Sequence, residues 1–324
     1  MSRSCLLFAV ASVLAFLTPS ASAQQAAKIP AVGVLVTHAA ADDPVFGNLR
    51  AGLHDYGYEE GRNLRLEILT AAGQLDRLPG LARELVLRKV DVILCPNEAS
   101  TRAALNATQS IPIVMLGFAY DPVAMGLVES LNRPGGNVTG LYSSTFELEG
   151  KRLEILKEAL PGVSRVTAVW EDPFGRSALD DLQRAARSLS IQLDLVRVRK
   201  SQELESAFKT AKAKRAGAIL LVWSPTFYVH RAEVATLALR MRMPTVAAFA
   251  AENGALISYG ADNAETFKRA AYYVDRLLKG AKPGELPVEQ MSKLKLSVNL
   301  RTAKTLGITI PESILLRADE VIRW

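Results

Sequence analysis

The chain alternates short apolar runs with amphipathic stretches of helical period along most of its length. The first four apolar runs are "AVGVLV", "NLRLEIL", "VDVIL" and "IPIVML". Between them, residues 44–56, 75–88 and 99–108 carry apolar positions at helical spacing. Apolar runs that alternate with helices are typical of a parallel sheet covered on both faces. The pattern therefore predicts right-handed βαβ units.

The same order of apolar runs begins again near residue 164. "SRVTAVW", "IQLDLVRV", "AGAILLV" and "RMPTVAAF" follow each other as the first four runs do, at an offset of roughly 130 residues. A proline opens the fourth run in both halves. Four matches in one order predict an α/β protein with two doubly wound, Rossmann-like parallel-sheet lobes.

Three segments do not fit a simple tandem repeat. They are the glycine-rich link "RPGGNVTG", the strand–helix pair that starts at "GALISYG", and the strand–helix unit of the C-terminal tail. We expect a chain that crosses three times between the lobes and so forms a hinge. The expected lobe one holds residues 28–142 and 258–284, and the expected lobe two holds residues 143–257 and 285–324.

The N-terminus has the composition of a secretory signal peptide. Residues 1–23 contain Arg3, an apolar run and the small-residue ending "ASA", so we expect cleavage after Ala23 and a periplasmic protein. A lipid anchor at Cys5 is disfavoured, because the apolar run follows that cysteine. The run is too short to span a membrane, and no later stretch is long and apolar enough to do so.

Cysteine content and charge narrow the classes of function. Loss of the signal leaves Cys95 as the one cysteine, so no intramolecular disulfide can form. It ends an apolar strand, which favours a buried small hydrophobe over a reactive thiol. The formal net charge is +6, but the basic groups "RVRK" and "KAKR" have no neighbouring aromatic platform. We therefore expect no nucleic-acid partner.

The sequence contains no recognisable catalytic motif. Its three histidines are not spaced as metal ligands, and the nucleophile-elbow, P-loop and dinucleotide-binding motifs are absent. The first strand is followed by "THAAADDP", which has no glycine to approach a pyrophosphate. We expect neither a catalytic residue nor a metal or cofactor, and an enzyme on this scaffold is the weakest alternative.

Binding is the function that the strand ends favour. Ligands of open α/β sheets lie beyond the carboxyl ends of the strands, and aromatic walls with a few polar anchors are typical of small-molecule pockets. Trp170 and Trp223 lie at such ends, either as pocket walls or as plugs between the lobes. The candidate contacts are Thr37, His38, Asn97, Ser100, Thr101, Tyr120 and Asp121 in the first half, and Trp170, Asp172, Ser177, Trp223, Phe227, Tyr228 and Glu252 in the second.

Several ordered segments resemble a known family. Among them are "GLHDYGYEEGRNLRLE", "LPGLARELVLRKVDVIL", "DPVAMGLVESLNRPGGNVTGL", "SPTFYVHRAEV" and "NLRTAKTLGITIPESILLRADEVI". The chain resembles the bacterial ABC transporter substrate-binding proteins of the tryptophan/tyrosine-type uptake family, over almost its whole length after the signal. The resemblance implies a type I periplasmic-binding-protein fold, a small-molecule ligand and an ABC permease as partner. It also implies ligand contacts at Asn97, Ala99, Ser100, Thr101, Tyr120 and Asp121.

The hypothesis is a monomeric solute receptor that closes over a carboxylate-bearing ligand, such as an amino acid, aromatic ones included. Ser100 and Thr101, at a helix start, would donate hydrogen bonds to the carboxylate. Asp121, Asp172 or Glu252 would balance an amine. Glu98 would have to point away from an anion or meet a positive group. A sensor module for a membrane signalling protein would have the same fold and is the main alternative.

Overall fold

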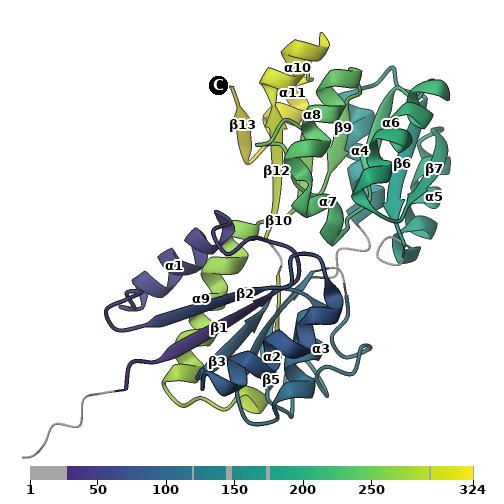
Figure 1. Cartoon of the computed structure of the whole chain (residues 1–324). Coiled ribbons are helices and arrows are strands. Elements are labelled where there is room, and N and C mark those ends of the chain that lie inside the picture. Colours follow the sequence, from purple (N-terminus) through teal and green to yellow (C-terminus); the bar gives the residue numbers. More distant parts are fainter. Residues whose placement is uncertain (1–27, 119, 144–147, 173–175, 292, 324) are drawn as a thin grey trace, which may run out of the picture.

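The structure is a computed structural model that describes residues 28–118, 120–143, 148–172, 176–291 and 293–323, without the side chains of Phe118 and Ser177. The predicted signal peptide lies outside the described residues. The chain forms two α/β lobes, one above the other in Figure 1. Within the described ranges, no helix is both long enough and apolar enough to cross a membrane.

Lobe one is built on a parallel sheet in the order β2-β1-β3-β4-β5-β11. Its strands are β1 (Ala31–Val36), β2 (Arg65–Thr70), β3 (Val92–Cys95), β4 (Ile113–Phe118), β5 (Val138–Ser143) and β11 (Glu289–Gln290). Its helices are α1 (Val45–Asp55), α2 (Leu78–Leu87), α3 (Glu98–Ala107) and α9 (Asn263–Leu278), with short 3₁₀ turns η1 (Leu75–Arg77) and η5 (Pro283–Glu285).

Alternation along the strands fixes which helices cover which face of this sheet. Val32 and Val34 of β1 pack with Phe46 of α1 and Phe267 of α9. Leu35, one residue along, packs on the other face with residues of α2 and α3. Successive side chains of a strand point to opposite faces, so an apolar run without polar interruption fills both cores. The sequence "AVGVLV" therefore predicts a strand buried on both sides, as observed.

Lobe two repeats this plan in the order β7-β6-β8-β9-β10-β12-β13. Its strands are β6 (Arg165–Glu171), β7 (Gln192–Val198), β8 (Ala218–Leu221), β9 (Thr245–Ala247), β10 (Ile257–Ala261), β12 (Leu294–Asn299) and β13 (Glu320–Ile322). Its helices are α4 (Leu148–Ala159), α5 (Leu179–Ser188), α6 (Leu204–Ala213), α7 (Pro225–Val229), α8 (Arg231–Met241), α10 (Leu300–Leu306) and α11 (Glu312–Leu315), with 3₁₀ turns η3 (Arg176–Ala178) and η4 (Ser201–Glu203).

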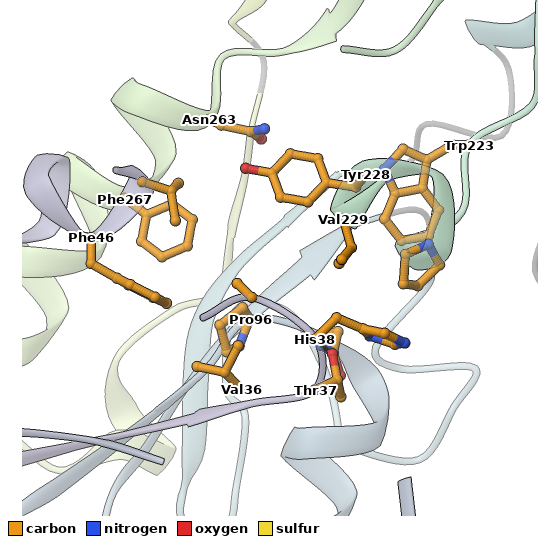
Figure 2. A pocket seen from close by; sticks show the side chains of 14 residues that line it. Val36, Thr37, His38, Phe46, Pro96, Trp223, Tyr228, Val229, Asn263 and Phe267 are labelled. Atoms are coloured by element: carbon orange, nitrogen blue, oxygen red, sulfur yellow. Dashed lines mark hydrogen bonds between the residues drawn. The ribbon is translucent and has the colours of Figure 1, made fainter. Parts of the chain in front are cut away.

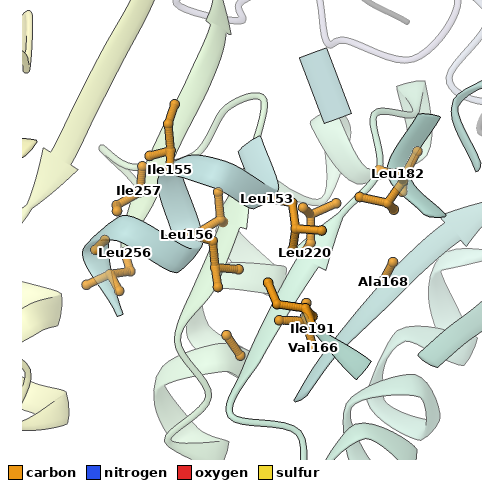
Figure 3. Packing of buried hydrophobic residues seen from close by; sticks show 14 of the residues in the cluster. Leu153, Ile155, Leu156, Val166, Ala168, Leu182, Ile191, Leu220, Leu256 and Ile257 are labelled. Carbon is orange, nitrogen blue, oxygen red and sulfur yellow. The ribbon is translucent and has the colours of Figure 1, made fainter. Parts of the chain in front are cut away.

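The two sheets share one strand order, which confirms the predicted repeat and fold class. β2-β1-β3-β4 in lobe one corresponds to β7-β6-β8-β9 in lobe two, and all of these pairs are parallel. The pair β10–β12 is antiparallel. Figure 3 shows Leu153 and Leu156 of α4 packed over Val166 and Leu220 of the lobe-two sheet. The second lobe thus has its own core, as the first does.

Two of the expected lobe boundaries are wrong. Residues from 258 onward were expected in lobe one, but β10 pairs with β9 and β12 in the lobe-two sheet. The chain was expected to return to lobe two at residue 285, but β11 still pairs with β5 of lobe one. Short apolar strands can join the edge of either sheet, so their hydrophobic pattern does not say which lobe they complete.

The chain passes from one lobe to the other three times, and backbone hydrogen bonds join these crossing segments to one another. The second crossing lies at Asp262, whose N–H donates to the carbonyl of Lys293 at 3.2 Å. The third follows β11, where the N–H of Met291 donates to the carbonyl of Tyr142 at 2.6 Å. Adjacent segments that run between two separate cores form a hinge, about which the lobes can open and close.

Candidate functional site

A pocket lies between the two lobes, where the strand ends of lobe one meet helix α7 of lobe two (Figure 2). It encloses about 630 Å³, part of which is open to solvent. Lobe one contributes Val36, Thr37, His38, Ala39, Val45, Phe46, Pro96, Asn97, Asn263 and Phe267, and lobe two contributes Trp223, Pro225, Tyr228 and Val229. We call this pocket the apolar compartment.

The floor of the apolar compartment is formed by the ends of β1 and β3. Asn97 begins α3 as its N-cap, and its side-chain oxygen accepts from the N–H of Ser100 at 3.0 Å. Its amide nitrogen donates to the hydroxyl of Thr37 at 2.7 Å. Beside this floor, the rings of Phe46 and Phe267 meet edge to face at 5.9 Å. The segment after each strand is therefore held in place by the segment after its neighbour.

The opposite wall is α7, whose sequence fixes its start. Ser224 accepts from the N–H of Phe227 at 3.1 Å, and Pro225 occupies the first turn, where no N–H is needed. Phe227 is fully buried in the lobe-two core. With Phe227 as anchor, Tyr228 and Val229 project into the pocket, and the Tyr228 hydroxyl points toward Asn263 (Figure 2).

Two buried carboxylates support this wall from beneath. Glu149 accepts from the N–H of Trp223 at 3.0 Å and forms an ion pair with Arg152, which in turn donates to the carbonyl of Tyr259 at 2.6 Å. Both side chains of the pair are at most 2% exposed. Glu171 accepts from the hydroxyl of Thr226 at 2.7 Å, and burial raises the pKa of Glu171. The burial of Glu149 and Arg152 could not be predicted from the sequence, since an i,i+3 pair of opposite charge is equally typical of an exposed helix surface.

The apolar compartment is electrically neutral. The described residues that line it include no Asp, Glu, Lys or Arg. Burial, followed by the nearby His230, lowers the pKa of His38, so its ring stays uncharged near neutral pH. Among the described residues, no group of His, Cys, Asp or Glu side chains is arranged to hold a metal ion. This surface suits an uncharged, aromatic or aliphatic part of a ligand.

A second, charged compartment adjoins the first on the hinge side. Its volume is about 950 Å³ when the part open to solvent is included. It shares Val45, Tyr228 and Asn263 with the apolar compartment. Its charged lining residues are Asp43, Arg231, Glu252, Asp262, Lys295 and Glu320. Asp43 of lobe one and Arg231 of lobe two form an ion pair of 3.2 Å across the cleft. Neutral and charged surfaces thus meet at Tyr228.

Six of the predicted contact residues line these compartments. Thr37, Asn97, Trp223 and Tyr228 line the apolar compartment, as does His38, and Glu252 lines the charged one. Trp223 therefore lies in a pocket wall. Phe227 and Ala99 lie close by but pack into the cores of lobe two and lobe one.

The hydroxyls of Ser100 and Thr101 do not face the cleft. Both residues are fully buried, and their hydroxyls donate to the carbonyl of Asn97 at 3.0 and 2.8 Å. The expectation that they donate to a ligand carboxylate does not fit this geometry, because Ser and Thr near a helix start readily bond to a backbone carbonyl of the preceding turn. Glu98 forms an ion pair of 2.6 Å with Arg102, one turn further along the same helix. The negative charge of Glu98 is therefore balanced within α3 and needs no positive group from a ligand.

The remaining predicted contacts lie outside both compartments. Tyr120 packs in the lobe-one core, and Asp121 accepts from the N–H groups of Val123 and Ala124 at 2.8 and 3.1 Å. Trp170 packs in the lobe-two core beneath Arg176, and Asp172 pairs with Arg176 at 2.9 Å. The side chain of Ser177 lies outside the described residues.

The remaining residues of interest are Cys95 and three pocket residues that the sequence did not predict. Cys95 is fully buried, and burial raises the pKa of its thiol, which confirms the structural interpretation. Phe46, Phe267 and Asn263 were not predicted as pocket residues. The helical period assigns both phenylalanines to a core, and Asn263 is recognisable only as the first residue after a helix cap.

Two α/β lobes, joined by a hinge and lining a pocket from both sides, define the architecture of a two-lobed solute receptor. The family model for ABC transporter substrate binding proteins matches residues 29–322. The chain belongs to this family and is the substrate-binding protein of an ABC transporter. The family match favours this function over a sensor module.

Individual relatives agree with the family match. A tyrosine-binding protein of Clostridioides difficile (strain R20291) is 28% identical over 284 residues, covering 86% of this chain and 80% of that protein. A conserved domain protein of Vibrio cholerae O1 biovar El Tor (strain N16961) is 30% identical, covering 91% and 100% of the two chains, with a TM-score of 0.79. A Streptococcus pneumoniae protein solved with L-Trp is 24% identical, covering 90% and 99%, with a TM-score of 0.78.

Proposed function

We propose that this protein binds an amino acid with an aromatic or large apolar side chain. The side chain lies in the apolar compartment, and the ammonium and carboxylate groups lie at its border with the charged compartment. The observation that carries the proposal is the contact between a neutral aromatic cavity and a charged one at Tyr228 and Asn263. An amphiphilic ligand of this class matches both surfaces at once.

The lining of the apolar compartment supports an aromatic ligand. Phe46, Phe267, Trp223 and Tyr228 present rings or ring edges from three sides of the cavity (Figure 2). Aromatic rings stack or meet edge to face with an energy beyond that of simple area burial. The tyrosine-binding relative and the neighbour solved with L-Trp bind ligands of this class, which adds to the case.

Closure of the lobes follows from where the contacts lie. Both lobes contribute to each compartment, so a ligand in the cleft contacts both and favours the closed state over the open one. The closed receptor then delivers the ligand to the permease. We further propose that the protein is exported by residues 1–23, works in the periplasm as a monomer, and has no catalytic activity.

Isothermal titration calorimetry tests the ligand class directly. The protein starting at Gln24 is titrated with L-tryptophan, L-tyrosine and L-phenylalanine, and with L-serine and L-glutamate for comparison. We expect at least one aromatic amino acid to bind with a Kd of about 1 μM or below, which corresponds to about −8 kcal/mol, and the polar amino acids to bind far more weakly. Binding of L-serine or L-glutamate without binding of any aromatic amino acid would contradict the proposal.

A further inference from the structure

The ion pair between Asp43 and Arg231 joins the two lobes across the cleft. Asp43 precedes α1 of lobe one, and Arg231 is the first residue of α8 in lobe two. Their side chains are 10% and 20% exposed, and an oxygen of Asp43 lies 3.2 Å from a guanidinium nitrogen of Arg231. Each charge is therefore largely withdrawn from water and is balanced by a residue of the opposite lobe.

Each partner is also held by its own lobe. The other carboxylate oxygen of Asp43 accepts from the N–H of Val45 at 3.0 Å. Arg231 donates from a second nitrogen to the carbonyl of Tyr228 at 3.0 Å, and its guanidinium lies over the Tyr228 ring at 4.6 Å. When the two residues separate, these contacts keep both charged groups at the edge of the cleft, in the orientation that a ligand would meet.

The pair lies where the charged part of an amphiphilic ligand must go. The described lining of the apolar compartment offers no charge, and the charged compartment that holds Asp43 and Arg231 begins at the shared residues Val45 and Tyr228. An amino acid whose side chain fills the first cavity brings an ammonium and a carboxylate into a partly dry space. Each of these groups is costly to bury without a partner of opposite charge.

The other charged residues of this compartment are already engaged or exposed. Lys295 pairs with Glu320 at 3.0 Å within lobe two. Asp262 caps α9 by accepting from the N–H of Glu265 at 3.2 Å and lies 3.8 Å from Lys293. Glu252 is exposed. Asp43 and Arg231 are set apart because they supply one charge of each sign, from opposite lobes, beside Tyr228.

We propose that the ligand's zwitterion inserts between Asp43 and Arg231, with the ammonium on Asp43 and the carboxylate on Arg231. The direct ion pair is then the ligand-free substitute for these two contacts. It keeps either charge from being buried alone when the cleft is partly closed without ligand. This inference rests on the proposed function, and it moves the carboxylate and amine contacts away from Ser100, Thr101 and Glu252.

A matrix of ligands and variants tests the exchange. The ligands are L-tryptophan, tryptamine, which lacks the carboxylate, and indole-3-propionate, which lacks the ammonium. The variants are Asp43→Asn and Arg231→Gln, with Glu233→Gln as a control, since Glu233 is an exposed residue of α8 that lines neither compartment. Each is titrated by calorimetry after circular dichroism has shown that it is folded, and Arg231→Lys replaces Arg231→Gln if the latter does not fold.

Each variant is expected to weaken only the ligands that carry the charged group it would contact. Asp43→Asn weakens L-tryptophan and tryptamine by about tenfold or more, since truncating one partner of a desolvated charge pair is costly, but it leaves indole-3-propionate unchanged or tighter. The Arg231 variant weakens L-tryptophan and indole-3-propionate but not tryptamine, and Glu233→Gln changes the affinity for none of the three. If L-tryptophan binds but each variant affects all three ligands alike, or none, the exchange is wrong and the proposed function stands. If no aromatic amino acid binds the wild-type protein, both fail.

Discussion

The side-chain amide of Asn97 connects the ends of two neighbouring strands, since its nitrogen donates to Thr37 at 2.7 Å while its oxygen caps α3. Asn97→Ala removes both bonds and should lower the free energy of unfolding by about 1–2 kcal/mol. Asn97→Asp keeps the cap oxygen, and the Thr37 hydroxyl can turn to donate, so its loss should be smaller. Urea denaturation measures both variants. Equal losses for the two would show that the cap contributes nothing to stability.

Fluorescence can report which tryptophan meets the ligand. Trp223 lines the apolar compartment, whereas Trp170 packs in the lobe-two core, and Trp324 lies outside the described residues. Excitation at the red edge of the tryptophan band avoids exciting the added L-tyrosine. Under this excitation, the tryptophan emission of the wild-type protein should change when L-tyrosine binds. Trp223→Phe should lose most of this change, and Trp170→Phe, the matched control, should keep it. Retention of the full change in Trp223→Phe would place the ligand elsewhere.

The strand ends were the part of the site that the sequence could predict. Thr37, Asn97 and Trp223 follow apolar runs, and the ends of parallel strands gather at one edge of a sheet. The hydroxyls of Ser100 and Thr101 were misjudged, because sequence does not show whether a hydroxyl at a helix start faces a ligand or bonds back to its own backbone.

The helical contributions could not be predicted in the same way. Phe46 and Phe267 have the spacing of core residues and do pack in the lobe-one core, yet the same rings border the pocket at its edge. Periodicity identifies the buried face of a helix but not where that face reaches a cavity. The lobe assignment of β10 failed for a related reason, because strand pairing is a property of the assembled sheet and not of the strand.

The buried pair of Glu149 and Arg152 should be far more sensitive to mutation than its spacing suggests. Arg152→Met leaves the Glu149 carboxylate buried with the N–H of Trp223 as partner and should lower the free energy of unfolding by about 3–5 kcal/mol. The same helix offers a control, the exposed i,i+3 pair of Lys151 and Glu154. Lys151→Met should change stability by about 0.5 kcal/mol or less. Similar losses for both variants, compared by urea denaturation, would contradict the assigned role.

Stability should fall in mild acid because of His38. Burial lowers the pKa of His38 in the folded state, whereas the unfolded chain binds the proton at about 6.5. The stability that depends on a neutral ring is therefore complete above that value and is lost as the pH falls toward and through the folded pKa. Glu171, whose pKa is raised by burial, acts in the opposite direction, so the wild-type profile alone does not isolate His38.

The variant His38→Gln separates the two contributions. It keeps a neutral polar side chain but cannot be protonated, so it should lose less stability than the wild type between about pH 7.5 and about pH 5. Urea denaturation at both pH values measures the difference. A variant whose stability falls as steeply as that of the wild type would show that His38 does not carry the effect.

Gly140 should tolerate no side chain, because β4 and β5 approach too closely there. Its φ is +135°, and an added Cβ would lie 2.2 Å from the carbonyl oxygen of Met115, its partner in β4. Gly140→Ala therefore combines backbone strain with a clash against a backbone that cannot yield, and should cost about 2–4 kcal/mol. Gly136→Ala is the matched control, since nothing lies within 4 Å of its added Cβ. Because β5 leads into the first crossing between the lobes, Gly140→Ala should also weaken ligand binding. Thermal unfolding of the two variants, with and without an aromatic amino acid, tests both effects, and equal melting temperatures would contradict the close approach.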